Sequence, residues 1–127
     1  MGHNHDTATT YRAYIALWNA ATEADQRRLL ADALTDDAYL AYPVFACRGT
    51  DEIIAGLVGL HERWPGVRFV QTSGIEEHHD WLRVGWRMVR ADGGVVMAGV
   101  DVAAVAADGR LQQVIGFHDP LPPAPRL

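Results

Sequence analysis

The sequence has few or none of several residue types, and each shortage limits what the chain can be. Its one cysteine, Cys47, excludes an intrachain disulfide and is typical of a reducing compartment. It has no lysine, and its 11 arginines are scattered, which argues against a nucleic-acid-binding surface. No apolar run approaches the length of a membrane span, and the N-terminus lacks the pattern of a secretory signal. We therefore expect a cytoplasmic protein without nucleic-acid or membrane partners.

The composition is that of an ordinary globular domain. Of the 127 residues, 49% are hydrophobic and 21% are charged, and the net charge is −5. No repeat or linker interrupts the chain, so we expect one domain over residues 1–127, with a polar extension over 1–6 and a proline-rich tail over 120–127. Nucleotide-binding loops, haem signatures and serine or cysteine nucleophile motifs are missing. The sequence predicts no cofactor.

Two histidine pairs resemble metal sites only superficially. His3 and His5 belong to the polar N-terminal extension, which favours an unstructured leader over a ligand set. His78 and His79 are neighbours in an extended segment, where adjacent side chains point to opposite faces, and no distant Cys or His completes a set of four ligands. The sequence predicts no metal site.

The first half of the chain is mainly helical. Amphipathic spacing predicts helices over residues 9–21, 22–34 and 50–64. The second opens with a capping-box pattern at Thr22 and is stopped by Asp36-Asp37, and the third is capped by Thr50. The apolar stripe of the first helix consists of Tyr11, Tyr14, Ile15 and Trp18.

The second half has the pattern of strands separated by turns. After a short edge strand over 38–45, which contains Pro43, strand-like runs cover 67–76, 81–90, 95–106 and 110–118. Three helices followed by a four-stranded meander predict an α+β fold, with the helices on one face of a curved antiparallel sheet.

Asp101 is the only ionisable residue in an apolar run over residues 95–105. A buried carboxyl either finds a partner or keeps its proton, so its place in the fold matters. Alternation puts Asp101 on one face with Met97, Gly99 and Ala103, and puts five valines and alanines on the other. Both faces are apolar, so we expect one to face the helices and the other to meet a second copy in a homodimer. We expect burial to raise the pKa of Asp101.

The neighbouring strands extend the inward face by the same alternation. Leu82, Val84, Trp86 and Met88 share one face of their strand, and Gln112, Val114, Gly116 and His118 share one face of the last strand. If Gly116 lies on the same face as Asp101, its missing side chain leaves room there for a ligand.

Six short motifs occur in a characteristic order: Ala13–Ala20, Asp36-Asp37-Ala38, Tyr42-Pro43, Arg48-Gly49-Thr50, Val100-Asp101-Val102 and Gly109-Arg110-Leu111. Together they resemble the ketosteroid isomerase and SnoaL-like polyketide cyclase superfamily over about residues 11–119. The resemblance implies the cone-shaped barrel of the nuclear transport factor 2-like fold. It also implies that Tyr14 and Asp101 are two donors to a developing oxyanion.

The resemblance fails at the general base. The isomerases carry an aspartate where this chain has Tyr42, and a phenol with a pKa near 10 is a poor base at neutral pH. His118, which alternation aims inward, is the substitute that we expect, although a surface histidine at a strand end fits the pattern as well. Asp119 matches a carboxylate of some cyclases but is out of phase. His61 is better explained as a helix-terminal histidine.

These residues predict a cofactor-independent acid/base enzyme, an isomerase, cyclase or dehydratase, that acts on a small apolar carbonyl compound through an enolate-like intermediate. Its catalytic residues would be Tyr14, Asp101 and His118. A non-catalytic binding module and a dimerisation domain of the same fold are the alternatives. An open pocket in which Tyr14 and Asp101 are in contact favours the enzyme or the binding module. A pocket filled by Trp18, Trp86 and Tyr42 favours the dimerisation domain. The residues expected to line the pocket are Trp18, Tyr42, Leu82, Val84, Trp86, Met88, Met97, Val114 and Gly116.

Overall fold

The computed structural model describes residues 6–126; residues 1–5, with His3 and His5, and Leu127 lie outside the described part. The helices and strands occur along the chain in the order expected for an α+β fold. They are α1 (Thr7–Asn19), α2 (Glu23–Ala33), β1 (Leu34–Tyr42), β2 (Phe45–Arg48), α3 (Thr50–Arg63), β3 (Arg68–Gln71), β4 (Glu76–His78), β5 (Trp81–Val89), β6 (Val95–Val105) and β7 (Leu111–His118).

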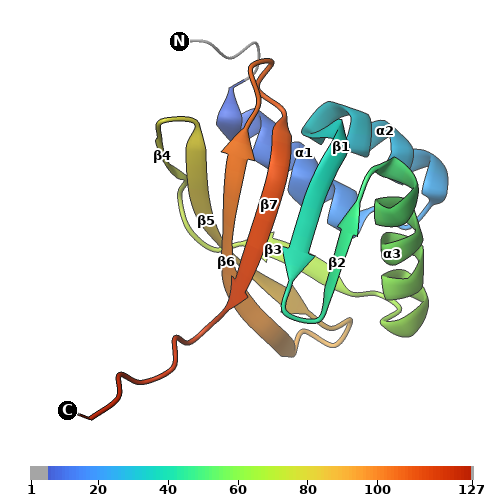
Figure 1. Ribbon diagram of the computed structural model, residues 1–127. Coiled ribbons are helices and arrows are strands. Elements are labelled where there is room, and N and C mark those ends of the chain that lie inside the picture. The colour runs from blue at the N-terminus through green and yellow to red at the C-terminus, as the bar shows by residue number, and fades with distance from the viewer. Residues whose placement is uncertain (1–5, 127) are drawn as a thin grey trace.

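The strands form one curved sheet in the order β2-β1-β7-β6-β5-β3, with β4 also paired to β5. The three helices pack on one side of it (Figure 1), which confirms the α+β, cone-like fold class. The sheet is mixed rather than purely antiparallel, because β1 and β7 are parallel. Parallel neighbours need a crossover connection, and here α3 and the strands β3 to β6 supply it. The sheet does not close into a barrel.

The helix boundaries differ from the prediction at three places. α1 begins at Thr7 rather than near residue 9, because the Asp6 side chain accepts a hydrogen bond from the Ala8 N–H and caps it. α2 ends at Ala33, and Leu34 already pairs with β7. α3 is capped by Gly49 at φ 84°, so Thr50 is its first residue and not its cap. None of the helices within residues 6–126 has the length and apolarity that crossing a membrane requires.

Two predicted strands are each divided in the structure. The run 67–76 becomes β3 and β4, which pair with different parts of β5, while the residues between them leave the ladder. The run 38–45 is interrupted at Pro43, where a turn reverses the chain and pairs Tyr42 with Phe45. Proline cannot continue a central ladder, so the turn at that point has a simple cause.

The predicted alternation is confirmed where the strands are regular. The inward residues of β5 are 1 to 5% exposed: Leu82, Val84, Trp86 and Met88. It is wrong at the start of β7, where Leu111 is fully buried and Gln112 is exposed. The register shifts there, because Val105 pairs with Leu111 while the next pair joins Ala104 to Gln113. The extra residue of this bulge reverses the faces, and the prediction holds again from Val114 onward.

Candidate active site

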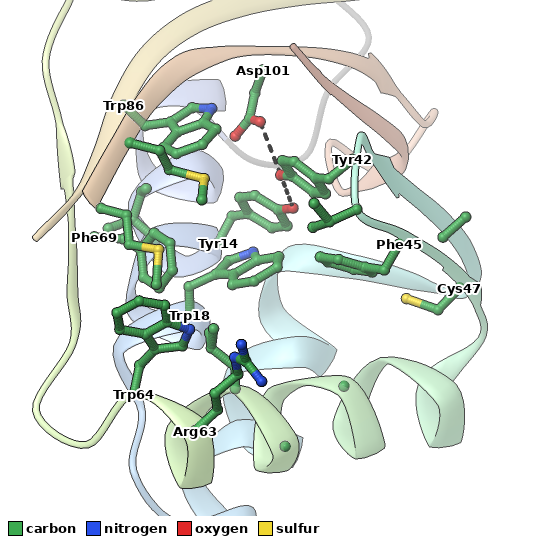
Figure 2. Close-up of a pocket in the computed structure, with 18 of the residues that line it drawn as sticks. Tyr14, Trp18, Tyr42, Phe45, Cys47, Arg63, Trp64, Phe69, Trp86 and Asp101 are labelled. Atoms are coloured by element: carbon green, nitrogen blue, oxygen red, sulfur yellow. Dashed lines mark hydrogen bonds between the residues drawn. The ribbon is translucent and has the colours of Figure 1, made fainter. Parts of the chain in front are cut away.

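A pocket of about 830 Å³ opens between α1, α3 and the inner face of the sheet. Its walls are mostly apolar, and Asp101 stands at one end of the residues drawn in Figure 2, far from α3. Besides Tyr14, aromatic side chains from five elements and one loop line it: Trp18, Tyr42, Phe45, Trp64, Phe69 and Trp86. The pocket is therefore open, although aromatic rings reach far into it.

Asp101 is 2% exposed and accepts a hydrogen bond on each carboxyl oxygen. The Tyr11 hydroxyl donates to Oδ2 at 2.8 Å, and the Tyr42 hydroxyl donates to Oδ1 at 2.9 Å. The Tyr14 and Tyr42 hydroxyls lie 2.7 Å apart. Because Tyr42 gives its single proton to Asp101, Tyr14 must be the donor in that pair. The result is one connected cluster in which Tyr42 joins Tyr14 to the carboxylate.

Helix and strand periodicity explain why these groups meet. Tyr11, Tyr14 and Trp18 are three and four residues apart, so they lie on one face of α1, toward the sheet. Asp101 points to the same interior from β6. The sequence pattern predicted Tyr11 only as a member of the apolar stripe, and its direct contact with Asp101 was not predicted. The contact could have been predicted, because Tyr11 lies three residues before Tyr14 and its hydroxyl is on the same face of the helix.

Gly116 does lie beside Asp101, since the two residues are partners in the β6–β7 register. The prediction that it leaves room for a ligand is wrong, because the Tyr42 ring fills that room. A Cβ on Gly116 would come within 2.1 Å of Tyr42 Cδ1 and Cε1. The missing side chain thus lets Tyr42 lie across β7 and reach Asp101.

Burial raises the pKa of Asp101 to about 6, while hydrogen bonding by Tyr11, Tyr42 and Trp86 acts to lower it. The direction agrees with the prediction. Burial and the neighbouring negative charge of Asp101 raise the pKa of Tyr11 and Tyr14 well above 10, and burial does the same for Tyr42. At pH 7 the cluster therefore holds three protonated phenols and a mostly ionised carboxylate, which is poised to take up one proton.

The pocket lining includes the three predicted catalytic residues and five of the nine predicted binding residues: Tyr14, Asp101 and His118, then Trp18, Tyr42, Trp86, Met88 and Met97. Four other predicted binding residues do not line it. Leu82, Val84 and Val114 belong to the main hydrophobic core, and Gly116 is covered by Tyr42. Alternation correctly predicts which face of the sheet a side chain lies on. It does not predict which part of that face packs against α1 and α2 and which part borders the pocket.

One wall of the pocket was not predicted from the sequence. It is the face of α3 that carries Glu52, Ala55, Gly56, Gly59, Leu60 and Arg63. Two glycines three residues apart inside a helix were the available signal, because glycine weakens a helix unless space or packing requires it. Cys47 on β2 also lines the pocket, and burial raises the pKa of its thiol.

The other candidates lie outside the cluster. The His118 ring packs edge-on against Trp86 at 6.2 Å, and within residues 6–126 it makes no hydrogen bond to Asp101 or Tyr14. Asp119 is exposed. His61 Nε2 lies 2.8 Å from the Trp18 carbonyl and ties α3 to α1, which supports its helix-terminal interpretation. No group of three His, Cys, Asp or Glu residues in the described part could hold a metal ion.

Comparison with known proteins gives a family match and many structural neighbours. The SnoaL-like domain matches residues 11–114. A candidate isomerase of the SnoaL-like family from Agrobacterium tumefaciens is 29% identical, with a TM-score of 0.83, over 90% of this chain and 97% of that one. No curated protein matches the sequence significantly.

More distant structures share the fold. An NTF2-like protein of unknown function from Exiguobacterium is 20% identical, with a TM-score of 0.70, over 87% of this chain and 98% of that one. A candidate SnoaL-like polyketide cyclase from Jannaschia is 19% identical, with a TM-score of 0.64, over 88% of this chain and 86% of that one. At this identity the likeness concerns the fold alone.

Proposed function

This chain belongs to the SnoaL-like family, and from that premise we propose that it is a cofactor-independent acid/base enzyme acting on a small, largely apolar carbonyl compound. The observation that carries the proposal is a single buried carboxylate with a pKa of about 6 at one end of an apolar pocket. A general base works best when its pKa lies near the working pH. A cytoplasmic homodimer is part of the same proposal.

The chemistry follows from the protonation states. The Asp101 carboxylate takes a proton from the carbon next to the substrate carbonyl, and the electrons of that C–H bond form the enolate. The Tyr14 hydroxyl turns from Tyr42 to donate a hydrogen bond to the enolate oxygen. Asp101 then returns the proton to the same or another carbon, or to a leaving group. Isomerisation, cyclisation and dehydration all pass through this intermediate.

This assignment gives Asp101 a different role from the one that the resemblance implies. A neutral carboxylic acid could donate to the oxyanion, but two phenols already donate to Asp101 and favour its ionised form. This chain has Tyr42 at the position where the isomerases have their carboxylate base. Asp101, which accepts a hydrogen bond from Tyr42, would serve as the base instead. His118, at the pocket wall beside Trp86, is the alternative base.

A non-catalytic binding module is the second candidate, and one observation favours it. Both oxygens of Asp101 have hydrogen-bond partners within the protein, so the cluster is complete without a ligand. A carboxylate still has further lone pairs for a proton, which is why we rank the enzyme first.

Proton exchange tests the proposal without knowledge of the natural reaction. Small neutral ketones are screened by thermal shift, and binders are incubated in D₂O while NMR follows loss of the protons next to the carbonyl. We expect the wild type to accelerate exchange, with a rate that rises with pH through about 6. Asp101→Asn should reduce the rate by about 10²–10⁴.

His118→Gln is the matched variant and should retain most of the activity. A large loss in His118→Gln with little loss in Asp101→Asn would make His118 the base. No exchange with any bound ketone would leave the binding module as the function.

A further inference from the structure

We propose that the pocket takes a flat ring compound with a carbonyl at one end and an anionic group at the other, and that Arg63 binds the anion. This inference rests on the proposed function, because the carbonyl end is assigned to the Asp101 cluster. It goes further by naming the chemical class of the ligand and the residue that selects it.

The α3 wall of the pocket is shaped for a flat group. A Cβ added at Gly56 or Gly59 would meet no heavy atom within 4 Å, so both positions face open space. Glycine weakens a helix relative to alanine, so two of them on one face need a reason. Across the pocket stand the rings of Trp18 and Phe45, above α3 in Figure 2. A bare helix surface facing aromatic rings leaves a slot in which a planar ring can stack.

Arg63 supplies an uncommitted positive charge at one end of this slot. It lines the pocket, and Figure 2 shows its guanidinium extending from α3 toward Trp18 and Trp64. Among residues 6–126, no ion pair or hydrogen bond engages the Arg63 side chain. A guanidinium binds carboxylates and related anions with two parallel hydrogen bonds.

The charge at the other end of the α3 wall sets the direction of the ligand. Glu52 also lines the pocket and lies about 16 Å from Arg63 along the helix, at 1.5 Å per residue. Its carboxylate accepts a hydrogen bond from the backbone N–H of Arg48 at 2.8 Å. An anion is therefore repelled from the Glu52 end and attracted to the Arg63 end. The chain as a whole carries a net charge of −5, so attraction of an anion depends on the local charge of Arg63.

The indole of Trp86 adds a donor at the Asp101 end of the pocket. Trp86 is 5% exposed and lines the pocket, and its indole N–H acts on Asp101 and helps to lower the pKa of that carboxyl. Figure 2 shows this nitrogen turned toward Asp101. A ligand oxygen that enters beside Asp101 can accept a hydrogen bond from this N–H or from the Tyr14 hydroxyl. The Asp101 end of the pocket thus suits a carbonyl, and the Arg63 end suits an anion.

Two probes that differ only in the anion test the inference: 2-acetylnaphthalene and 6-acetyl-2-naphthoic acid. Calorimetry at low ionic strength should give about five- to tenfold tighter binding for the acid. Arg63→Gln should remove this preference and leave binding of the neutral ketone unchanged. Arg68→Gln, which changes an exposed arginine outside the pocket, should leave both affinities unchanged.

Gly59 variants test the slot itself. Gly59→Leu should weaken both probes by about tenfold or more, whereas Gly59→Ala should weaken them only slightly, with both variants folded by circular dichroism. The inference is overturned if the acid binds no tighter than the ketone, if neither binds, or if the preference survives Arg63→Gln. Deuterium exchange at the acetyl group of the same probes is scored separately. Arg63-dependent binding without exchange would support this inference and contradict the proposed base.

Discussion

The two faces of β6 and β7 differ sharply, although the same strands build both. On the inner face, Asp101 is 2% exposed and all its oxygens are hydrogen bonded. On the outer face there is no ionisable group, and Phe117 is 55% exposed. No helix or strand of the described chain covers that face in Figure 1. Neighbouring residues of one strand therefore lie in opposite surroundings. One side chain belongs to a buried, fully hydrogen-bonded cluster, and the next belongs to an uncovered apolar surface.

The buried carboxyl of Asp101 should produce the largest effect, as a dependence of stability on pH. The folded pKa of Asp101, about 6, lies above its unfolded value. The unfolded state therefore loses its proton first, and stability falls as pH rises from about 4 to about 6, by roughly 3 kcal/mol. Asp101→Asn should remove this pH dependence and be neutral or stabilising at pH 7. Urea unfolding at pH 4 and pH 7 measures both effects, and a clear loss of stability at pH 7 would contradict them.

Gly116→Ala should disturb the inner face by steric conflict. The new methyl group would overlap the Tyr42 ring, so the ring must move and its hydrogen bond to Asp101 must lengthen or break. We expect a loss of about 1–3 kcal/mol in the free energy of unfolding. Ala98→Val, which adds bulk to the outer face of β6, is the matched control and should change stability by less than about 0.5 kcal/mol. Equal effects would mean that the two faces are packed alike.

Tyr11→Phe should produce a smaller loss. It deletes the hydroxyl that donates to Asp101 Oδ2 and leaves the fully buried ring in place. A hydrogen bond to a charged group contributes about 1.5–3 kcal/mol, but protonation of Asp101 can offset part of it, so we expect about 1 kcal/mol at pH 7 and less at pH 4. Denaturation at both pH values checks this, and a loss that is larger at pH 4 would argue against the assigned protonation states.

Changes on the outer face should alter assembly more than folding. The partly exposed apolar residues there favour a homodimer: Val96, Ala98, Val100, Val102, Ile115 and Phe117. We expect light scattering to show a dimer for the wild type and a folded monomer for Val100→Glu. Leu121→Glu, in the exposed tail, should leave the dimer intact. A monomeric wild type would contradict this prediction.

Sequence reasoning succeeded where one periodicity controls the outcome. Alternation was enough to turn Trp86 inward and to restrict Asp101 to the interior or a subunit interface. Helical spacing was enough to put Tyr14 on the apolar stripe of its helix, and the family resemblance linked it to Asp101. It failed where a feature depends on contacts between distant elements. The bulge before Gln113, the Tyr42 ring over Gly116 and the open wall of α3 each require knowledge of how strands and helices pack.

The pKa of Asp101 tests the central claim most directly, and NMR titration of its carboxyl carbon measures it without a ligand. We predict a value of about 6 in the wild type. Tyr42→Phe should raise it further, because the hydrogen bond from Tyr42 stabilises the ionised form. A wild-type pKa at or below its ordinary value of 3.8, or one that Tyr42→Phe leaves unchanged, would contradict the account of Asp101 as a base tuned by burial and by the tyrosine cluster.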